Sequence, residues 1–189
     1  MKNEINRIAD RLVKAFNTNT VINPIPVKYC KNINLANKLR KLCEDQIKDE
    51  TIGIKAGGTG IQALKKLKEK EPFTAKVFKK RLVKSGQKVK INQHTKGIEV
   101  EVYYFIKKSF FDFKGKVTKS NITKFIKFMG PCFEIVGFRQ RNKKFTYLGD
   151  ICGDFGFNIK FVVGRKTKFK KLNLNNCLLY TSDAADDRS

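Results

Sequence analysis

Three glutamates lie inside two stretches of the chain that otherwise have the composition of buried β-strands. The stretch GIEVEVYYF, at 97–105, is rich in branched and aromatic residues and contains no proline, which predicts a strand. Glu99 and Glu101 stand two residues apart and therefore share one face of that strand. Glu134 lies inside the second stretch, CFEIVGF, at 132–138. Burying like charges together is costly, so the fold must offset their repulsion and desolvation.

A hard divalent cation explains these three carboxylates best. Mg²⁺ and Mn²⁺ take oxygen ligands in octahedral geometry, so three protein oxygens leave about three positions for water or substrate. A site with such open positions is typical of catalytic metal centres. The E-x-E spacing alone is also compatible with a solvated strand face whose glutamates pair with lysines, and the residues leave both interpretations open.

Helices lead the chain and strands dominate its remainder. The apolar spacing predicts helices at 4–16, 35–47 and 121–129, a further helix after residue 60, and strands at 51–58, 132–138 and 158–164. Asn34 is expected to cap the second helix, and Thr59 with Gln62 forms a capping box for the helix that follows. Without regular βαβ alternation or an internal repeat, this order predicts an α+β fold with a mixed or antiparallel sheet.

The composition favours a cytoplasmic protein with no membrane partner. No apolar run approaches the roughly 18 residues that a membrane span needs, and the first ten residues lack the apolar core of a signal peptide. The five cysteines are odd in number and form no C-x-x-C pair, which argues against both a disulfide framework and a zinc site.

The net charge of +24 raises the question of nucleic-acid binding. The basic residues are 33 Lys and only 8 Arg, and they are spread along the whole chain instead of forming a block. The chain is also rich in Asn, Ile and Phe, as proteins of AT-rich genomes are. We therefore interpret the charge as compositional and expect no nucleic-acid partner.

The composition changes abruptly near the end of the chain. Residues 177–189, CLLYTSDAADDRS, resemble translated sequencing-adapter sequence. We expect a non-native tail at 177–189 that packs against nothing, preceded by a single, incomplete domain at 1–176.

Four segments, read in order, resemble the 2-keto-4-pentenoate hydratase family of the fumarylacetoacetate hydrolase superfamily. They are GIKAGGTGIQALKKLKEKEPFTAKVF, GIEVEVYYFIKKSFF, GPCFEIVGFRQR and GDICGDFGFNIKFVVG, and the resemblance covers roughly Asp45 to Leu174. It implies N-terminal helices followed by the mixed β-sheet core of that superfamily, with the family's C-terminal part missing.

The resemblance also implies roles for individual residues. Glu99, Glu101 and Glu134 match the Mg²⁺ or Mn²⁺ ligands, Lys55 matches an active-site lysine, and Arg139 and Asp154 match substrate-binding positions. Two departures concern the water-activating chemistry. The family's A-D-N segment has lost its Asn here, and Lys80 falls near the position of an active-site Asp.

The activity implied by the resemblance is hydration of a 2-hydroxy-2,4-dienoate to a 4-hydroxy-2-oxo acid, as in aromatic-compound catabolism, by a homo-oligomeric lyase when full length. Decarboxylation of 2-oxo diacids and hydrolytic C–C cleavage of acylpyruvates on the same scaffold remain alternatives, because a fold does not determine a reaction. A catalytically inactive basic binding module is the alternative from another class.

Overall fold

The computed structural model describes residues 3–91 and 94–170. Its helices are α1 (Glu4–Thr18), α2 (Lys28–Lys31), α3 (Ile33–Asp45), α4 (Ile61–Lys66) and α5 (Leu148–Cys152). Its strands are β1 (Thr51–Gly57), β2 (Phe73–Phe78), β3 (Leu82–Lys84), β4 (Thr95–Ile106), β5 (Ile126–Gly137), β6 (Asn158–Val163) and β7 (Thr167–Lys168). Among these residues no helix has the length and apolarity that crossing a membrane requires. The predicted tail at 177–189 lies outside the described residues.

The two amphipathic helices predicted near the N-terminus are confirmed, with ends shifted by about two residues. Helix α1 buries the apolar face predicted for it and ends at Asn19, whose left-handed conformation (φ 55°) is common after a helix. Helix α3 begins two residues earlier than expected. Its N-cap is Asn32, whose Oδ1 accepts the N–H groups of Asn34 and Leu35 at 3.0 and 3.1 Å, so the prediction that Asn34 caps this helix is wrong.

Two further local predictions are wrong. Helix α4 begins after Gly60, and no side chain caps it, so Thr59 and Gln62 form no capping box. The helix predicted at 121–129 is a short 3₁₀ turn at Ile122–Phe125, which passes directly into β5. Pairing with β4 explains this second error, because its register, with Phe105 opposite Phe128, extends the strand into the predicted helix.

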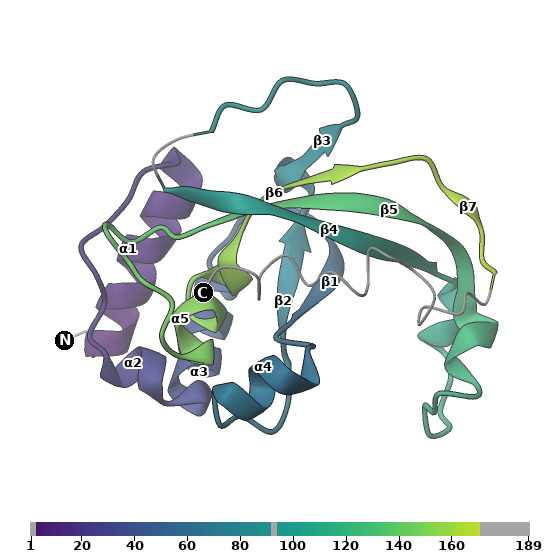
Figure 1. Ribbon diagram of the computed structural model, residues 1–189, viewed down its shortest axis with the longest axis horizontal. Helices are drawn as coiled ribbons and strands as arrows, with labels where there is room; N and C mark the ends of the chain where they lie inside the picture. The colour runs from purple at the N-terminus through teal and green to yellow at the C-terminus, as the bar shows by residue number, and fades with distance from the viewer. Residues whose placement is uncertain (1–2, 92–93, 171–189) are drawn as a thin grey trace.

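The strands form two sheets. Strands β1 and β2 pair as an antiparallel hairpin, and the larger sheet has the order β3-β6-β5-β4, with β7 pairing with β5. Its β3–β6 pair is parallel and its other pairs are antiparallel. In Figure 1 the long β4–β5 ribbon runs above the β1–β2 hairpin, and α1, α2, α3 and α5 gather at one side. This arrangement confirms the predicted α+β fold with a mixed sheet.

The main core joins the N-terminal helices to the segment that precedes β6. Phe16 of α1 stacks on Phe155 with ring centroids 4.4 Å apart and meets Phe78 edge-on at 5.7 Å. All three rings are buried. Because Phe155 lies just before β6, this packing holds the start of that strand against the helical layer.

The two faces of the β4–β5 ribbon differ in character. Ile98, Val100 and Phe133 on one face are 59%, 44% and 50% exposed, while the glutamates occupy the opposite face. The β4 strand is therefore less buried than its composition indicates. The β1–β2 hairpin lies below the ribbon in Figure 1, and its Lys55 contacts Glu134, so the hairpin covers the side of the glutamates.

Candidate metal centre

The register of β4 and β5 brings the three glutamates together. Glu99 stands directly opposite Glu134, and Glu101 stands opposite Cys132, so all three side chains leave the ribbon on the same face. One carboxylate oxygen from each lies within 4.8 Å of the others. The convergence predicted from two separate strands is confirmed, and it places as many as three negative charges in one small volume.

The three carboxylates differ in burial. Glu134 is buried with 2% of its surface exposed, whereas Glu99 is half-buried and Glu101 is exposed. Burial raises the pKa of Glu134, and the ammonium of Lys55 acts in the opposite direction. Cys132 is also buried on this face, and its burial, with the nearby Glu134 and Glu101 charges, raises its thiol pKa to about 11. The desolvation cost expected for all three glutamates therefore falls mainly on Glu134.

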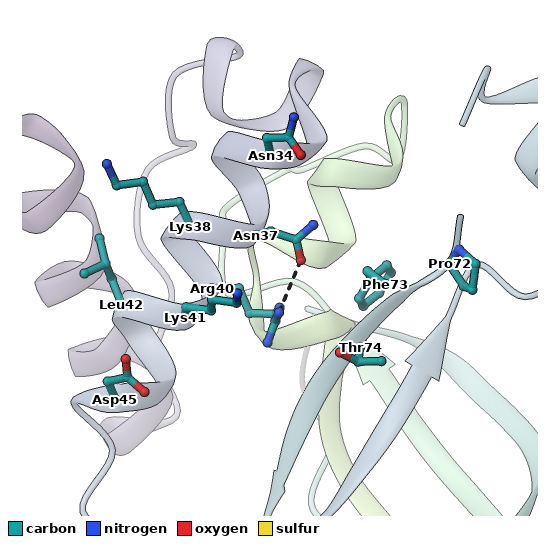
Figure 2. Close-up of a pocket in the computed structure, with 10 residues that line it drawn as sticks. All are labelled: Asn34, Asn37, Lys38, Arg40, Lys41, Leu42, Asp45, Pro72, Phe73 and Thr74. Atoms are coloured by element: carbon teal, nitrogen blue, oxygen red, sulfur yellow. Dashed lines mark hydrogen bonds between the residues drawn. The ribbon is translucent and has the colours of Figure 1, made fainter. Parts of the chain in front are cut away.

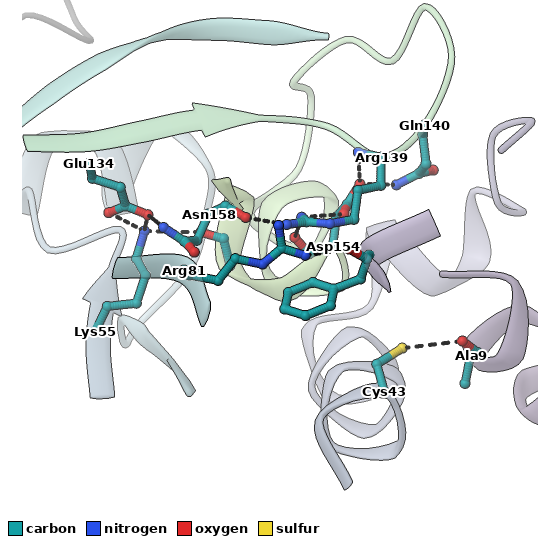
Figure 3. Close-up of polar contacts among 11 residues, drawn as sticks. Ala9, Cys43, Lys55, Arg81, Glu134, Arg139, Gln140, Asp154 and Asn158 are labelled. Carbon is teal, nitrogen blue, oxygen red and sulfur yellow. Dashed lines mark hydrogen bonds and ion pairs between the residues drawn. The ribbon is translucent and has the colours of Figure 1, made fainter. Parts of the chain in front are cut away.

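Lys55 neutralises Glu134 from the neighbouring hairpin. Its Nζ lies 2.5 Å from Oε1 and 2.6 Å from Oε2 of Glu134 and donates to the carbonyl of Gly156 at 3.0 Å (Figure 3). Alternation along β1 aims Lys55 inward while Ile54 is 72% exposed. Lys55 is half-buried, and a cationic group already lies on the innermost of the three carboxylates.

A turn of unusual conformation completes the site. Phe155, Gly156 and Phe157 have successive φ values of 53°, 67° and 69°, a region that phenylalanine rarely adopts. Glycine is required at the centre for a second reason, because a Cβ there would lie 2.7 Å from the Cβ of Ala75. Non-glycine residues in such conformations cost about 1–3 kcal/mol each and persist only where the surroundings hold them. The turn directs the Gly156 carbonyl at Lys55 and leads into Asn158.

Arg139 and Asp154 are found inside the protein, in contact with each other. The Arg139 N–H donates to Asp154 Oδ2 at 2.8 Å, and its Nη1 lies 3.2 Å from Oδ1. Only 3% of Arg139 and none of Asp154 is exposed. Burial lowers the pKa of Arg139, and the Asp154 carboxylate opposes that shift. The structure thus brings these two predicted site residues together at the base of the turn, behind the glutamates.

Two guanidinium groups lie against the ring of Phe16. Arg81 lies 3.6 Å from its centroid and Arg139 lies 4.9 Å from it, and Arg81 also donates to the Phe16 carbonyl (Figure 3). Lys80, which falls near the expected position of an acid, donates to Asn17 Oδ1 at 3.0 Å, and its carbonyl accepts from Lys160 at 2.9 Å. The contact with Asn17 directs the Lys80 side chain towards α1.

Three contributors to the site went unrecognised in the sequence. Asn158 Nδ2 donates to Glu134 Oε1 at 3.3 Å, the Gly156 carbonyl accepts from Lys55, and Gln140 Nε2 donates to Asp154 Oδ2 at 3.1 Å. The only sequence signal for Asn158 is that it is a polar residue at the first position of an apolar strand. The Gly156 carbonyl has no sequence signal, because every residue has a backbone carbonyl.

An open groove of about 620 Å³ lies elsewhere, between α3 and the start of β2 (Figure 2). The residues that line it are Asn34, Asn37, Lys38, Arg40, Lys41, Leu42, Asp45, Pro72, Phe73 and Thr74. Its buried cation, Arg40, already pairs with Glu44 at 2.6 Å and with Asn37 at 3.2 Å. The groove contains none of the predicted site residues.

Comparison with solved structures identifies the architecture around this site. Two structures of 4-oxalocrotonate decarboxylase from Pseudomonas putida G7 match 90% of the chain, with TM-scores of 0.68 and 0.71 and 15% identity. The chain has the fold of these decarboxylases. It spans 66% of the length of each. The predicted order of N-terminal helices followed by a mixed β-sheet core is confirmed at the level of the fold.

The two solved structures differ in what they bind. One is complexed with magnesium and adipate, and the other with calcium and acetate. No family model matches the sequence. A search of curated proteins also returned no match. At 15% identity the shared property is the fold, so the chemistry of this chain must be argued from its own residues.

Proposed function

We propose that the protein is a metal-dependent enzyme that acts on a 2-oxo or dienoate acid, with Mg²⁺ or Mn²⁺ held by Glu99, Glu101 and Glu134. The observation that carries this proposal is the convergence of three carboxylate oxygens within 4.8 Å. Oxygens bound to one Mg²⁺ at about 2.1 Å lie at most about 4.2 Å apart.

The donor set fits a hard cation. All three candidate ligands are carboxylates, the ligands that Mg²⁺ and Mn²⁺ prefer. Lys55 shows that the site accommodates positive charge, since its ammonium contacts both oxygens of Glu134. A bound divalent ion would supply Lewis-acid polarisation of the substrate's carboxylate and 2-oxo oxygens.

The residues of the chain would bind the substrate and move its protons. Lys55 Nζ lies on the glutamate-bearing face, 2.5 Å from a proposed ligand, with 11% of its side chain exposed. We assign it the transfer of one proton to the substrate carbon while the 2-hydroxyl group loses its proton to solvent, so that the dienol becomes a ketone and the lysine regains a proton from solvent. Arg139 and Asp154 are assigned to substrate binding through the turn that they support, because Asp154 begins that turn and Arg139 donates to the carbonyl of Asn158 at its end.

The reaction that we propose first is addition of water to a 2-hydroxy-2,4-dienoate, giving a 4-hydroxy-2-oxo acid. Decarboxylation of a 2-oxo diacid is the second candidate, and the likeness to two decarboxylase structures favours it. Both reactions develop negative charge on the 2-oxo oxygen, so the same carboxylate-bound cation and the same lysine would serve either.

One assay separates these reactions. The protein is incubated with Mg²⁺ or Mn²⁺ and, in turn, a 2-hydroxy-2,4-dienoate, a 4-oxalocrotonate-type diacid and an acylpyruvate. Hydration predicts loss of the dienoate absorbance with incorporation of solvent oxygen, whereas decarboxylation predicts release of CO₂ from the diacid. A Glu134→Gln variant and a chelator are the controls, and both should abolish turnover. If none of the three acids is consumed with either metal, the binding-module alternative replaces the enzyme.

A further inference from the structure

The turn at Asp154–Asn158 contacts both members of the innermost ion pair. Its Gly156 carbonyl accepts from Lys55 Nζ at 3.0 Å, and the side chain of Asn158 donates to Glu134 Oε1 at 3.3 Å. Asn158 is only 5% exposed. A single five-residue segment therefore contacts the proposed proton donor and one of the proposed metal ligands.

The orientation of the Asn158 amide follows from its surroundings. Its nitrogen faces two acceptors, Glu134 Oε1 at 3.3 Å and the Lys160 carbonyl at 3.4 Å. The opposite orientation would place the amide oxygen against two other oxygens, which is unfavourable. Asn158 thus acts as a donor toward the carboxylate.

The position of Asn158 depends on the buried pair behind it. Its backbone carbonyl accepts from Arg139 Nη2, and Arg139 is in turn held by the carboxylate of Asp154. The register of β5 and β6 shifts between Ile135 and Val136, next to the Val136–Asn158 pair. That irregularity allows Asn158 to reach diagonally to Glu134, whose direct partner on β6 is Phe161.

We propose that Asn158 is a positioning residue that fixes the rotation of the Glu134 carboxylate, and that the Arg139–Asp154 pair holds Asn158 in place for this purpose. The proposal rests on the proposed metal centre. Asn158 Nδ2 and Lys55 Nζ both contact Oε1, at 3.3 and 2.5 Å, and Lys55 Nζ also contacts Oε2 at 2.6 Å, so these two donors together set the rotation of the carboxylate. Residues that orient a metal ligand in this way typically contribute 10–100-fold to metal affinity.

The test measures Mn²⁺ affinity by the loss of the free-ion signal in electron paramagnetic resonance, without any substrate. Asn158→Leu keeps the size of the side chain and removes its donor, and roughly 10–100-fold weaker binding is expected. Asn158→His keeps an N–H donor and should recover most of the affinity. Asn34→Ala, on the exposed face of α3, is the matched control and should bind as the wild type does.

Each outcome decides the proposal. Equal affinity of Asn158→Leu and the wild type would overturn the positioning role while leaving the metal centre intact. Failure of the wild type to bind Mn²⁺ would instead overturn the proposed function, and the positioning role with it. If Asn158→Leu does not fold, Asn158→Ser replaces it, because its hydroxyl is too short to reach the carboxylate. The same loss is then expected, and wild-type affinity would again refute the role.

Discussion

Replacing Lys55 by methionine tests the charge balance of the site. The pair that it forms with Glu134 is buried, with 11% of the Lys55 side chain and 2% of the Glu134 side chain exposed. Methionine fills most of the same volume but leaves the carboxylate without its cation. Removing one partner of a buried pair typically costs about 3–5 kcal/mol, because the remaining charge is left uncompensated. At about 2–4 °C for each kcal/mol in a chain of this size, the midpoint of thermal unfolding should fall by roughly 6–20 °C.

A divalent cation should reverse much of that loss. With Lys55 removed, the ion no longer competes with an ammonium for Glu134, so Mg²⁺ should stabilise the variant more than the wild type. Mass action gives about 2.7 kcal/mol when the free ion is at 100 times its dissociation constant. The assay is thermal unfolding followed by circular dichroism, with a chelator and then with Mg²⁺, for both proteins.

The matched control is Lys79→Met. Lys79 also pairs with a glutamate, Glu50 at 2.7 Å, but 67% and 62% of the two side chains are exposed. Its loss should leave the unfolding midpoint unchanged, because solvent screens exposed pairs. If Lys55→Met unfolds at the wild-type midpoint in chelator, or if Mg²⁺ stabilises both proteins equally, the assignment of Lys55 as the internal counter-ion of this site is wrong.

Three further predictions concern the ligands, the thiols and the surface charge. Glu101→Gln keeps the shape of a ligand but removes its charge, so Mn²⁺ binding should weaken at least 10-fold in the same resonance titration; unchanged affinity would exclude Glu101 from the ligand set. Burial raises the thiol pKa of Cys30, Cys132 and Cys152 from 9.0 to about 11, so the native protein should resist iodoacetamide at pH 8, and peptide mapping should show labelling of these sites only after unfolding. The thiol pKa values of the folded protein exceed those of the unfolded chain, so the buried thiols contribute their full share of the free energy of unfolding below pH 9 and lose it as the pH rises toward 11. Urea unfolding measured at several pH values from 9 to 11 would detect this loss. If the charge of +24 is compositional, duplex DNA should bind weakly and without sequence preference, and it should dissociate as salt is raised from about 50 to 200 mM. Tight, sequence-selective binding in a filter-binding assay would contradict this interpretation.

The spacing of apolar residues along the sequence correctly predicted the helices that bury a single apolar face and the strands that consist of a single apolar run. Helices α1 and α3 follow the 3.6-residue spacing of their buried side chains, and the two-residue period of a strand is sufficient to place Glu99 and Glu101 on one face. The failures arose where partners far along the chain decide the outcome. The apolar residues of segment 121–129 have helical spacing, but the residues from Ile126 onward form hydrogen bonds with β4 and belong to strand β5.

The sequence by itself determined the fold class and the set of carboxylates, because both depend on short-range periodicity and on residue types. Only the tertiary structure decided how that set is arranged. The register that puts Glu134 opposite Glu99 is a property of two paired strands, and Lys55 reaches Glu134 across 79 positions of the chain. The contact of Asn158 with Glu134 depends on a turn whose conformation is imposed by packing and by the buried Arg139. Such contacts are invisible to local pattern because the energy that selects them, the pairing of buried charges, exists only once distant segments have come together.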